Sequence, residues 1–386
     1  MKKYYLFIVL AICFSQEIRF IDEIFEQIHI SEDIVYGNAP DLPFLFIIES
    51  NTNDIDLHMD IYEPLGDTMI DRPVIIFAHS GAFFIGNKTA EDMVALSETA
   101  AKRGYVAISM EYRLGLNILS SDSGERAVFR SVQDGSAIIR YLREYHDLYN
   151  IDPDKIFVWG SSAGAFMGLH LSYLDDSERP SSTYGSTFSP DLGCINCEGN
   201  SFNHNHKPNA LISTWGGIGD LDYIDVDENV PTAFFHGTSD IVVPYNFGYP
   251  FTLNITLPQV YGSELISEKL TSSNIDNLLV LENGESHEYY GTTNGNFFLG
   301  GGPNEYWEQI TSTAFNFLYN YLDISDNIVG DINNDDLTNI QDIVILVNFI
   351  LELASPSPQD FAIADINSDN ILNVLDILLI VNEITS

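Results

Sequence analysis

Six short runs of apolar residues recur along the first 325 residues, and amphipathic stretches such as 89–103 and 126–146 separate them. Each run is continuously apolar and rich in β-branched residues, which is typical of strands buried on both faces. Strands that alternate with helices predict an α/β fold, with a mostly parallel sheet covered on both sides. The runs are Pro73–Ala78, Tyr105–Met110, Lys155–Trp159, Ala210–Trp215, Thr232–Phe235 and Asn277–Leu281.

The pattern changes near residue 325. Residues 326–386 contain no Lys or Arg and carry eleven acidic residues. Two copies of one polar loop stand 34 residues apart there, and each is followed by an apolar helical stretch, 343–353 or 377–384. We therefore expect a larger domain over residues 16–325 and a small all-α domain over residues 326–386.

The first residues predict a targeting segment. Lys2 and Lys3 precede an apolar run from Tyr4 to Phe14, which is too short to span a bilayer and has the length of a signal peptide. We predict a signal peptide over residues 1–15, so the protein is expected to be secreted or held at the cell surface. Lipid attachment at Cys13 is the alternative, although Ile12 fits a lipobox poorly.

The charge balance excludes several classes of partner. The chain has 16 Lys and Arg against 56 Asp and Glu, a formal charge of −40. Such a surface repels phosphate backbones and anionic headgroups, so binding to nucleic acid or to anionic membranes is not expected. Later apolar stretches are interrupted by Asp or Asn, so no membrane span is expected either.

A sequence of the form G-x-S-x-G, Gly160-Ser161-Ser162-Ala163-Gly164, lies between a predicted strand and an apolar helical run. This context is the one that a nucleophile elbow requires, because the tight turn exposes a serine above the sheet. Ser162 is therefore the predicted nucleophile. The alternative is a Gly-Ser turn without chemistry.

An activated serine needs a base, and the base needs an orienting acid. Asp240 and His287 each follow a predicted strand, at the edge of the sheet where open α/β proteins bind ligands. They also stand in the order Ser, Asp, His that this elbow accompanies. Asp220 and Asp222 compete for the role of the acid, and His236 competes for that of the base. His236 precedes Asp240, and we expect it to brace the loop that holds Asp240.

The segment His79–Phe83 follows another strand, where a loop that binds the oxyanion is expected. The predicted donors are the main-chain N–H groups of Gly81, Ala82 and Ala163. Ala82 stands where a glycine is usual, and its Cβ restricts φ.

With these motifs in place, residues 55–322 resemble the α/β-hydrolase superfamily, in particular secreted carboxylesterases of the acetyl-esterase, feruloyl-esterase and hormone-sensitive-lipase types. The segment Met110–Leu114 resembles the Y-R-L segment of that family. The resemblance implies hydrolysis of carboxylic esters through Ser162, Asp240 and His287, without a cofactor for catalysis. We interpret Arg113 and Asp134 as a structural ion pair.

Cys194 and Cys197 remain once the signal peptide is removed. In an exported protein this pair is expected to form a disulfide within a loop. Zinc binding with His204 and His206, or free thiols, are the alternatives.

In each copy of the C-terminal loop, oxygen-bearing side chains stand at positions 1, 3, 5, 9 and 12, and position 7 offers its carbonyl. This spacing wraps one calcium ion, so we predict two structural calcium ions; two acidic turns without metal are the alternative. The first site uses Asp331, Asn333, Asp335, Leu337, Asn339 and Asp342, and the second uses Asp365, Asn367, Asp369, Ile371, Asn373 and Asp376.

The duplicated loop and helix over residues 328–384 resemble a type I dockerin module. The resemblance implies binding to a cohesin on a scaffold that organises polysaccharide-degrading enzymes. Positions 10 and 11 are Ile340-Gln341 and Val374-Leu375, and the usual basic residues are absent. A role in surface sorting or self-association therefore remains an alternative.

Taken together, these features predict a secreted serine carboxylesterase that acts on short-chain acyl or feruloyl esters, with a plant or algal polysaccharide on the alcohol side. A serine peptidase of related fold and a non-catalytic calcium-dependent scaffold or adhesion protein are the alternatives. Short acyl groups are expected because no segment predicts a long apolar tunnel. The insertions 175–208 and 245–262 are expected to shape the pocket, with Phe83, Phe84, Tyr245 and Phe247 as candidate lining residues.

Overall fold

The computed structural model forms two units. Clustering of contacts places the division between Tyr321 and Leu322, close to the predicted residue 325. The predicted signal peptide, residues 1–15, lies outside the described residues. The structure describes residues 18–42, 49, 52–187, 189–225, 229–251, 255–298, 301–322, 330–333, 337–351, 353–356, 358–367 and 371–385.

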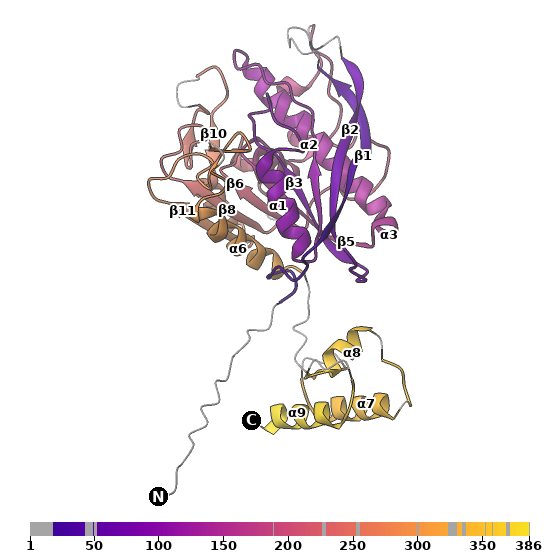
Figure 1. The fold of residues 1–386 in the computed structure, drawn as a ribbon. Helices are drawn as coiled ribbons and strands as arrows, with labels where there is room; N and C mark the ends of the chain where they lie inside the picture. The colour runs from indigo at the N-terminus through magenta and orange to yellow at the C-terminus, as the bar shows by residue number, and fades with distance from the viewer. Residues whose placement is uncertain are drawn as a thin grey trace, which may run out of the picture. The chain divides into compact units, whose positions relative to one another are not determined.

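The larger unit is built on one mixed sheet (Figure 1). Within the described residues, its strands lie in the order β1-β2-β4-β3-β5-β6-β8-β11, and every neighbouring pair from β4 to β11 is parallel. This arrangement confirms the predicted α/β-hydrolase fold. The strands are β1 (Ile28–Asp41), β2 (Asn53–Pro64), β3 (Arg72–Ala78), β4 (Val106–Met110), β5 (Ile151–Ser161), β6 (Ala210–Thr214), β8 (Thr232–Gly237) and β11 (Asn277–Glu282).

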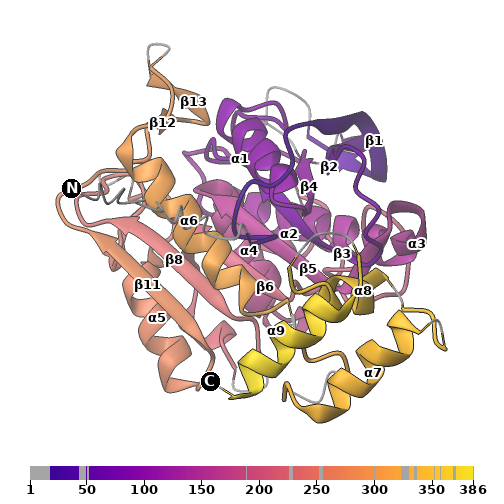
Figure 2. The same cartoon turned by 60° about the horizontal axis from the view of Figure 1, so that its bottom comes forward.

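Helices cover both faces of this sheet (Figures 1 and 2). Phe315 of α6 packs on Trp159 of the central strand β5, with ring centroids 5.7 Å apart, while α4 packs on the opposite face with α2. No helix in the described part of the chain has the length and apolarity needed to cross a membrane. The helices are α1 (Glu91–Lys102), α2 (Ser121–Glu144), α3 (His146–Tyr149), α4 (Ala163–Tyr173), α5 (Ser263–Ser272) and α6 (Glu305–Tyr319).

Strands β1 and β2 were not predicted from the sequence. They form an antiparallel pair at the edge of the sheet, and their register shifts between Ser31 and Ile34 and between Val35 and Gly37. Shifts of this kind break the alternation of polar and apolar residues by which a half-buried strand is identified. The remaining short elements are β7 (Gly217–Ile218), β9 (Phe247–Gly248), β10 (Val260–Gly262), β12 (Thr292–Thr293), β13 (Asn296–Phe297), η1 (Asp176–Glu178), η2 (Ser181–Thr183) and η3 (Leu221–Tyr223).

The C-terminal unit is helical. It contains α7 (Ile340–Ile350), α8 (Pro358–Ala364) and α9 (Val374–Thr385), and α7 and α9 follow the two predicted calcium loops. Its small core includes Leu346 from α7, Ile363 from α8 and Ile380 from α9, all buried. The apolar stretches after the two loops therefore pack against each other, as an all-α module requires.

Candidate active site

Ser162 occupies the sharp turn between β5, which ends at Ser161, and α4, which begins at Ala163. Its φ and ψ are 51° and −109°, a conformation that non-glycine residues rarely adopt. The Ser162 N–H donates to the carbonyl of Thr214 on the neighbouring strand at 3.0 Å, which helps to hold the turn. Strained residues of this kind cluster at functional sites, where the surrounding structure over-determines them.

The two glycines that flank Ser161–Ala163 are required because main-chain atoms of other residues lie too close to leave room for a side chain. A Cβ on Gly160 would lie 2.2 Å from the carbonyl oxygen of Gly164, and a Cβ on Gly164 would lie 2.1 Å from that of Ala78. Both neighbours are main chain, so neither can rotate away. The G-x-S-x-G pattern thus allows α4 to start directly against β3.

The structure brings Ser162, His287 and Asp240 into one hydrogen-bonded line. The distance from Ser162 Oγ to His287 Nε2 is 2.9 Å, and that from His287 Nδ1 to Asp240 Oδ2 is 2.6 Å. Asp240 follows β8 and His287 follows β11, so both lie beyond the carboxyl ends of parallel strands. This geometry suits a serine whose proton is taken by a histidine that a carboxylate holds in one tautomer.

Both carboxylate oxygens of Asp240 have hydrogen-bond partners. Its Oδ1 accepts from the N–H groups of Val242 and Val243 at 2.8 and 2.9 Å, and its Oδ2 lies 3.2 Å from His236 Nε2. Burial alone would raise the pKa of Asp240, but hydrogen bonds and charge from His236 and His287 outweigh burial and hold that pKa well below its usual range. His236 therefore contacts the acid and is not next to the serine, in line with a bracing role.

The competing carboxylates have other contacts. Asp220 caps η3, where its side chain accepts from the N–H of Asp222 at 3.0 Å. Asp222 is exposed. Only Asp240 of the three candidates has a contact with His287 in the described part of the chain.

The loop after β3 adopts an unusual main-chain path. Gly81, Ala82 and Phe83 have φ values of +114°, +55° and +56°. The Gly81 carbonyl accepts from the N–H groups of Phe84 and Ile85, each at 3.0 Å, which closes the turn. The sequence indicated that the Cβ of Ala82 restricts its φ. The structure nevertheless places Ala82 in the left-handed region, and the two hydrogen bonds to the Gly81 carbonyl help to offset the cost of that conformation.

Two of the predicted main-chain donors, one in this loop and one at the start of α4, belong to residues that line the nucleophile's pocket. Ala82 and Ala163 line the same cavity as Ser162, and their N–H groups have no hydrogen-bond partner in the described part of the chain. Ala163 is the first residue of α4, where an N–H has no partner within the helix. Gly81, the third predicted donor, does not line the cavity. The pair Ala82 and Ala163 therefore suits the developing oxyanion best.

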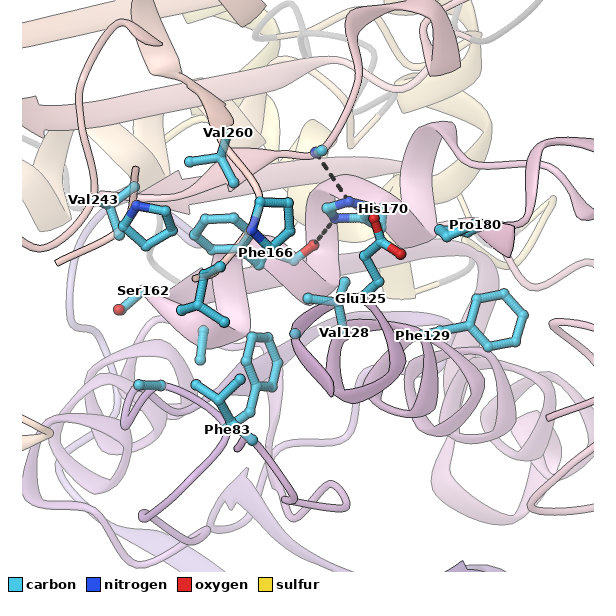
Figure 3. Close-up of a pocket in the computed structure, with 18 of the residues that line it drawn as sticks. Phe83, Glu125, Val128, Phe129, Ser162, Phe166, His170, Pro180, Val243 and Val260 are labelled. Atoms are coloured by element: carbon cyan, nitrogen blue, oxygen red, sulfur yellow. Dashed lines mark hydrogen bonds between the residues drawn. The ribbon is translucent and has the colours of Figure 1, made fainter. Parts of the chain in front are cut away.

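A mainly apolar cavity of about 240 Å³ opens beside Ser162 (Figure 3). One wall runs along α4: Ser162 just before the helix, Phe166 and His170 within it and Leu174 just after it line the cavity at every fourth position. Of the candidate lining residues, Phe83 lines the cavity, whereas Phe84, Tyr245 and Phe247 do not. The other walls come from the N-terminal part of α2, from Pro180 of the insertion 175–208, and from Pro250, Phe251, Leu257, Pro258 and Val260 of the insertion 245–262.

The walls of the cavity come from several separate segments of the chain. No single segment is a long apolar tunnel, because the walls come from pieces far apart along the chain. Sequence reasoning also missed the polar residues Glu125, His170 and Tyr223 in its lining. The repeat of every fourth residue after Ser162 was the available signal, since residues at that spacing share one helix face.

The insertion 175–208 is fastened to α2. Cys194 and Cys197 form a disulfide, and the side-chain amide of Gln133 donates to the carbonyls of Leu192 and Cys194 at 2.6 and 2.9 Å. His204 pairs with Glu144 at 2.7 Å instead of joining the cysteines around a metal. The structure therefore corresponds to the disulfide and not to the zinc alternative.

Arg113 and Asp134 form a buried ion pair at 2.8 Å, and the N–H of Arg113 also donates to Asp134. Burial raises the pKa of Asp134 to about 6, although the Arg113 charge and hydrogen bonds oppose that rise. The pair ties the loop after β4 to α2, and neither residue lines the cavity. This is a structural contact, as expected.

The C-terminal loops bury carboxylates. Asp331, Asp342, Asp365 and Asp376 are each at most 8% exposed, in a segment that has no Lys, Arg or His from residue 326 onward. Asp335 and Asp369 lie outside the described residues, and no group of three metal-ligating side chains gathers within the described ones. Carboxylate, amide and main-chain carbonyl oxygens at this repeated spacing are the donors that calcium prefers, so the donor set fits calcium.

The two loops also have the same local bonds. Asp342 Oδ2 accepts from the N–H of Asn339 at 2.8 Å, and Asp376 Oδ2 accepts from that of Asn373 at 2.9 Å. The Asn339 and Asn373 amides donate to the carbonyls of Leu337 and Ile371, each at 3.0 Å. The sequence repeat is therefore a structural repeat.

Two family models match the chain. Residues 59–221 match the BD-FAE family, and residues 329–385 match the dockerin type I domain. The larger unit is thus similar to the BD-FAE family and the C-terminal unit to the dockerin type I domain, in line with the resemblances that the sequence motifs indicated. Dockerin type I domains bind calcium.

Part of the larger unit is similar in sequence to known carboxylesterases, and a solved esterase structure has a similar fold. Carboxylesterase 3B of Mus musculus is 31% identical over 29% of this chain and 19% of its own length. The para-nitrobenzyl esterase of Bacillus subtilis is 30% identical over 31% of this chain and 24% of its own length. The chain thus spans less than a quarter of these relatives. Esterase 2 of Thermogutta terrifontis, phosphonylated by cyclosarin, has a TM-score of 0.50 and 20% identity, over 79% of this chain and 97% of that chain, which shows a common fold.

Proposed function

We propose that this protein is a serine carboxylesterase that hydrolyses esters through Ser162, His287 and Asp240. The observation that carries the proposal is the hydrogen-bonded line from Asp240 through His287 to Ser162, at 2.6 and 2.9 Å, at the mouth of an apolar cavity. A chance cluster would not also place the serine on a strained turn at the start of a helix.

The reaction begins when Ser162 Oγ attacks the ester carbonyl and its proton passes to His287 Nε2. Asp240 keeps the Nδ1 proton of His287 in place and stabilises the charged imidazole. The carbonyl oxygen becomes negative and accepts from the N–H groups of Ala82 and Ala163. The C–O bond to the alcohol then breaks, and the proton on His287 passes to the alcohol oxygen. A water molecule releases the acyl group by the same steps.

We further propose that the substrates are short-chain acyl or feruloyl esters, with a plant or algal polysaccharide on the alcohol side. The dockerin domain supports this choice, because it implies a partner of the cohesin type. Export by the segment 1–15 belongs to the same proposal. In the C-terminal unit, one calcium ion per loop would be held by the two ligand sets given above.

A panel of p-nitrophenyl esters from acetate to decanoate, with methyl ferulate, acetylated xylan and a peptide panel, tests the activity. We expect hydrolysis of esters and none of peptides. A fluorophosphonate probe should label the wild-type protein at Ser162 and leave Ser162→Ala unlabelled. Labelling of neither protein would point to a non-catalytic scaffold, and cleavage of peptides in preference to esters would point to a peptidase.

A further inference from the structure

A network of buried side chains adjoins the catalytic residues and takes no part in the proposed reaction. Trp215 Nε1 donates to Ser161 Oγ at 3.0 Å, and the Ser161 side chain forms a hydrogen bond with that of Tyr290. The Tyr290 hydroxyl in turn donates to Asp92 Oδ2 at 2.6 Å. These four residues make up the inner network. All four are fully buried, and none lines the cavity beside Ser162, so a substrate bound there does not contact them.

The bonds of the inner network all run in one direction. An indole N–H can only donate, so the Ser161 oxygen accepts from Trp215 and the Ser161 proton is available to the Tyr290 oxygen. Burial, together with the charges of Asp92 and Glu288, holds the pKa of Tyr290 well above its usual range, so its hydroxyl keeps the proton that it donates. Each hydroxyl thus donates once and accepts once, and hydrogen bonds in such a series strengthen one another.

The inner network connects the two chain segments that carry the nucleophile and the base. Ser161 directly precedes Ser162 at the end of β5, and Tyr290 follows His287 by three residues. The bond between Ser161 and Tyr290 therefore joins these segments inside the protein, in addition to the bond within the triad itself. The ring centroid of Trp215 lies 6.3 Å from that of His287 and 4.6 Å from that of Tyr290. The network is thus placed to set the distance between the two segments.

The segment that carries His287 depends on outside contacts for its shape. It consists of turns between β11 and β12, and its Glu288 is buried with a φ of 51°. Strained turns of this kind persist only when the surrounding structure holds them. Helix α1 supplies part of that support, because Asp92 accepts from Tyr290 and its N–H donates to the carbonyl of Gly295 at 3.1 Å. The Tyr290 hydroxyl therefore fixes the loop both to α1 and to the nucleophile turn.

We propose that Tyr290 is a positioning residue, whose hydroxyl holds the loop of His287 at the distance from the nucleophile turn that brings Nε2 within 2.9 Å of Ser162 Oγ. This inference rests on the proposed esterase function. A displacement of about 1 Å between reacting groups can lower an enzymatic rate by about 100-fold. Because the inner network does not contact the substrate, its loss should slow proton transfer and leave binding intact, which lowers kcat and not KM.

The test uses Tyr290→Phe in the full chain. This change removes the hydroxyl and keeps the ring, which packs on Trp215 and stacks on Trp307 at a centroid distance of 5.1 Å. We expect kcat on p-nitrophenyl acetate, and the rate at which a fluorophosphonate labels Ser162, to fall at least about tenfold, with KM within about twofold of the wild type. Ser161→Ala breaks the same bond and should give a similar loss. The double variant should lose no more than the larger single loss, because both changes remove one interaction.

Tyr173→Phe is the matched control. Tyr173 is also fully buried, and its hydroxyl donates to the carbonyl of Val230 at 2.7 Å, so the change likewise removes a buried hydrogen bond. It lies at the end of α4 away from Ser162 and does not line the cavity. We expect a lower thermal midpoint with wild-type kcat, because lost stability alone does not move the catalytic residues.

The outcomes separate this proposal from the esterase function. A folded Tyr290→Phe protein with wild-type kcat and labelling rate overturns the positioning role, and so does a higher KM at unchanged kcat. An equal loss of kcat in Tyr173→Phe would attribute the effect to lost stability and overturn the role as well. If Tyr290→Phe does not fold, Ser161→Ala decides by the same criteria. A wild type that neither hydrolyses the acetate nor reacts with the probe overturns the esterase function instead.

Discussion

The most direct test of the proposed reaction is Asp240→Asn, because the structure fixes how the new amide would lie. Oδ1 of Asp240 accepts from two main-chain N–H groups, of Val242 and Val243. An amide NH₂ in that position would face two donors, so the amide oxygen must stay there. The NH₂ group must then point at His287 Nδ1, where Oδ2 now lies at 2.6 Å.

That orientation changes the tautomer of His287. An NH₂ donor opposite Nδ1 requires Nδ1 to accept, so the proton moves to Nε2, which then cannot take the proton of Ser162. Loss of the correct tautomer in serine hydrolases lowers kcat by about 10⁴. At 1.36 kcal/mol per tenfold, a loss of 10³ to 10⁴ is about 4 to 5.5 kcal/mol of transition-state stabilisation.

The assay is steady-state hydrolysis of p-nitrophenyl acetate at pH 7, with the thermal midpoint measured on the same samples to verify folding. Asp222→Asn is the matched control, because Asp222 is exposed and has no contact with His287 in the described part of the chain. The control should keep wild-type kcat. A folded Asp240→Asn protein within tenfold of the wild-type kcat would refute this account of Asp240.

Three further outcomes follow from the structure. Gly164→Ala should lower kcat/KM on p-nitrophenyl acetate by about 100-fold or more, because its Cβ would lie 2.1 Å from the Ala78 carbonyl and α4 would move together with Ser162. EDTA should reduce the helical circular dichroism of the full chain and leave ester hydrolysis unchanged, and calcium should restore the signal; an unchanged spectrum would contradict calcium-dependent folding. Burial raises the pKa of Asp92 to about 7, so the folded protein binds a proton there that the unfolded chain releases above pH 3.8. The stability that the protonated carboxyl contributes is therefore full below pH 3.8 and is lost as the pH rises to 7. Asp92→Asn should therefore stabilise the protein at pH 8, by at most about 4 kcal/mol, and not at pH 4, which calorimetry at both pH values would check.

The triad residues were predictable because each follows a strand with an apolar run. Strands β5 and β8 are largely buried, whereas β11 lies at the edge of the sheet and is half-buried instead of buried on both faces as its sequence suggested. Ser162, Asp240 and His287 come after β5, β8 and β11, three strands whose apolar runs are plain in the sequence. Parallel strands carry the residues that follow them to one edge of the sheet. Local signals therefore sufficed for a site whose members are up to 125 residues apart.

The conformation of the loop after β3 was beyond sequence reasoning. Positive φ at Ala82 and Phe83 opposes their intrinsic preference and is held by tertiary bonds. The Phe83 carbonyl accepts from the N–H groups of Gly115 and Leu116 at 2.7 and 3.1 Å, more than 30 positions along the chain. The cavity could not be predicted from the sequence either, because residues distant along the chain line it, such as Glu125 of α2 and Val260 of the insertion 245–262.

Helix α4 begins directly after the reacting serine, and residues along it and just beyond it form one wall of the cavity. Its first turn sets the attack geometry, while Phe166, His170 and Leu174 decide what fits beside it. Substitution at these three positions offers a compact library for redirecting selectivity in directed evolution, since none of them belongs to the proton-transfer line. Diversification of this enzyme toward new esters would thus begin along a single helix, with the nucleophile left in place.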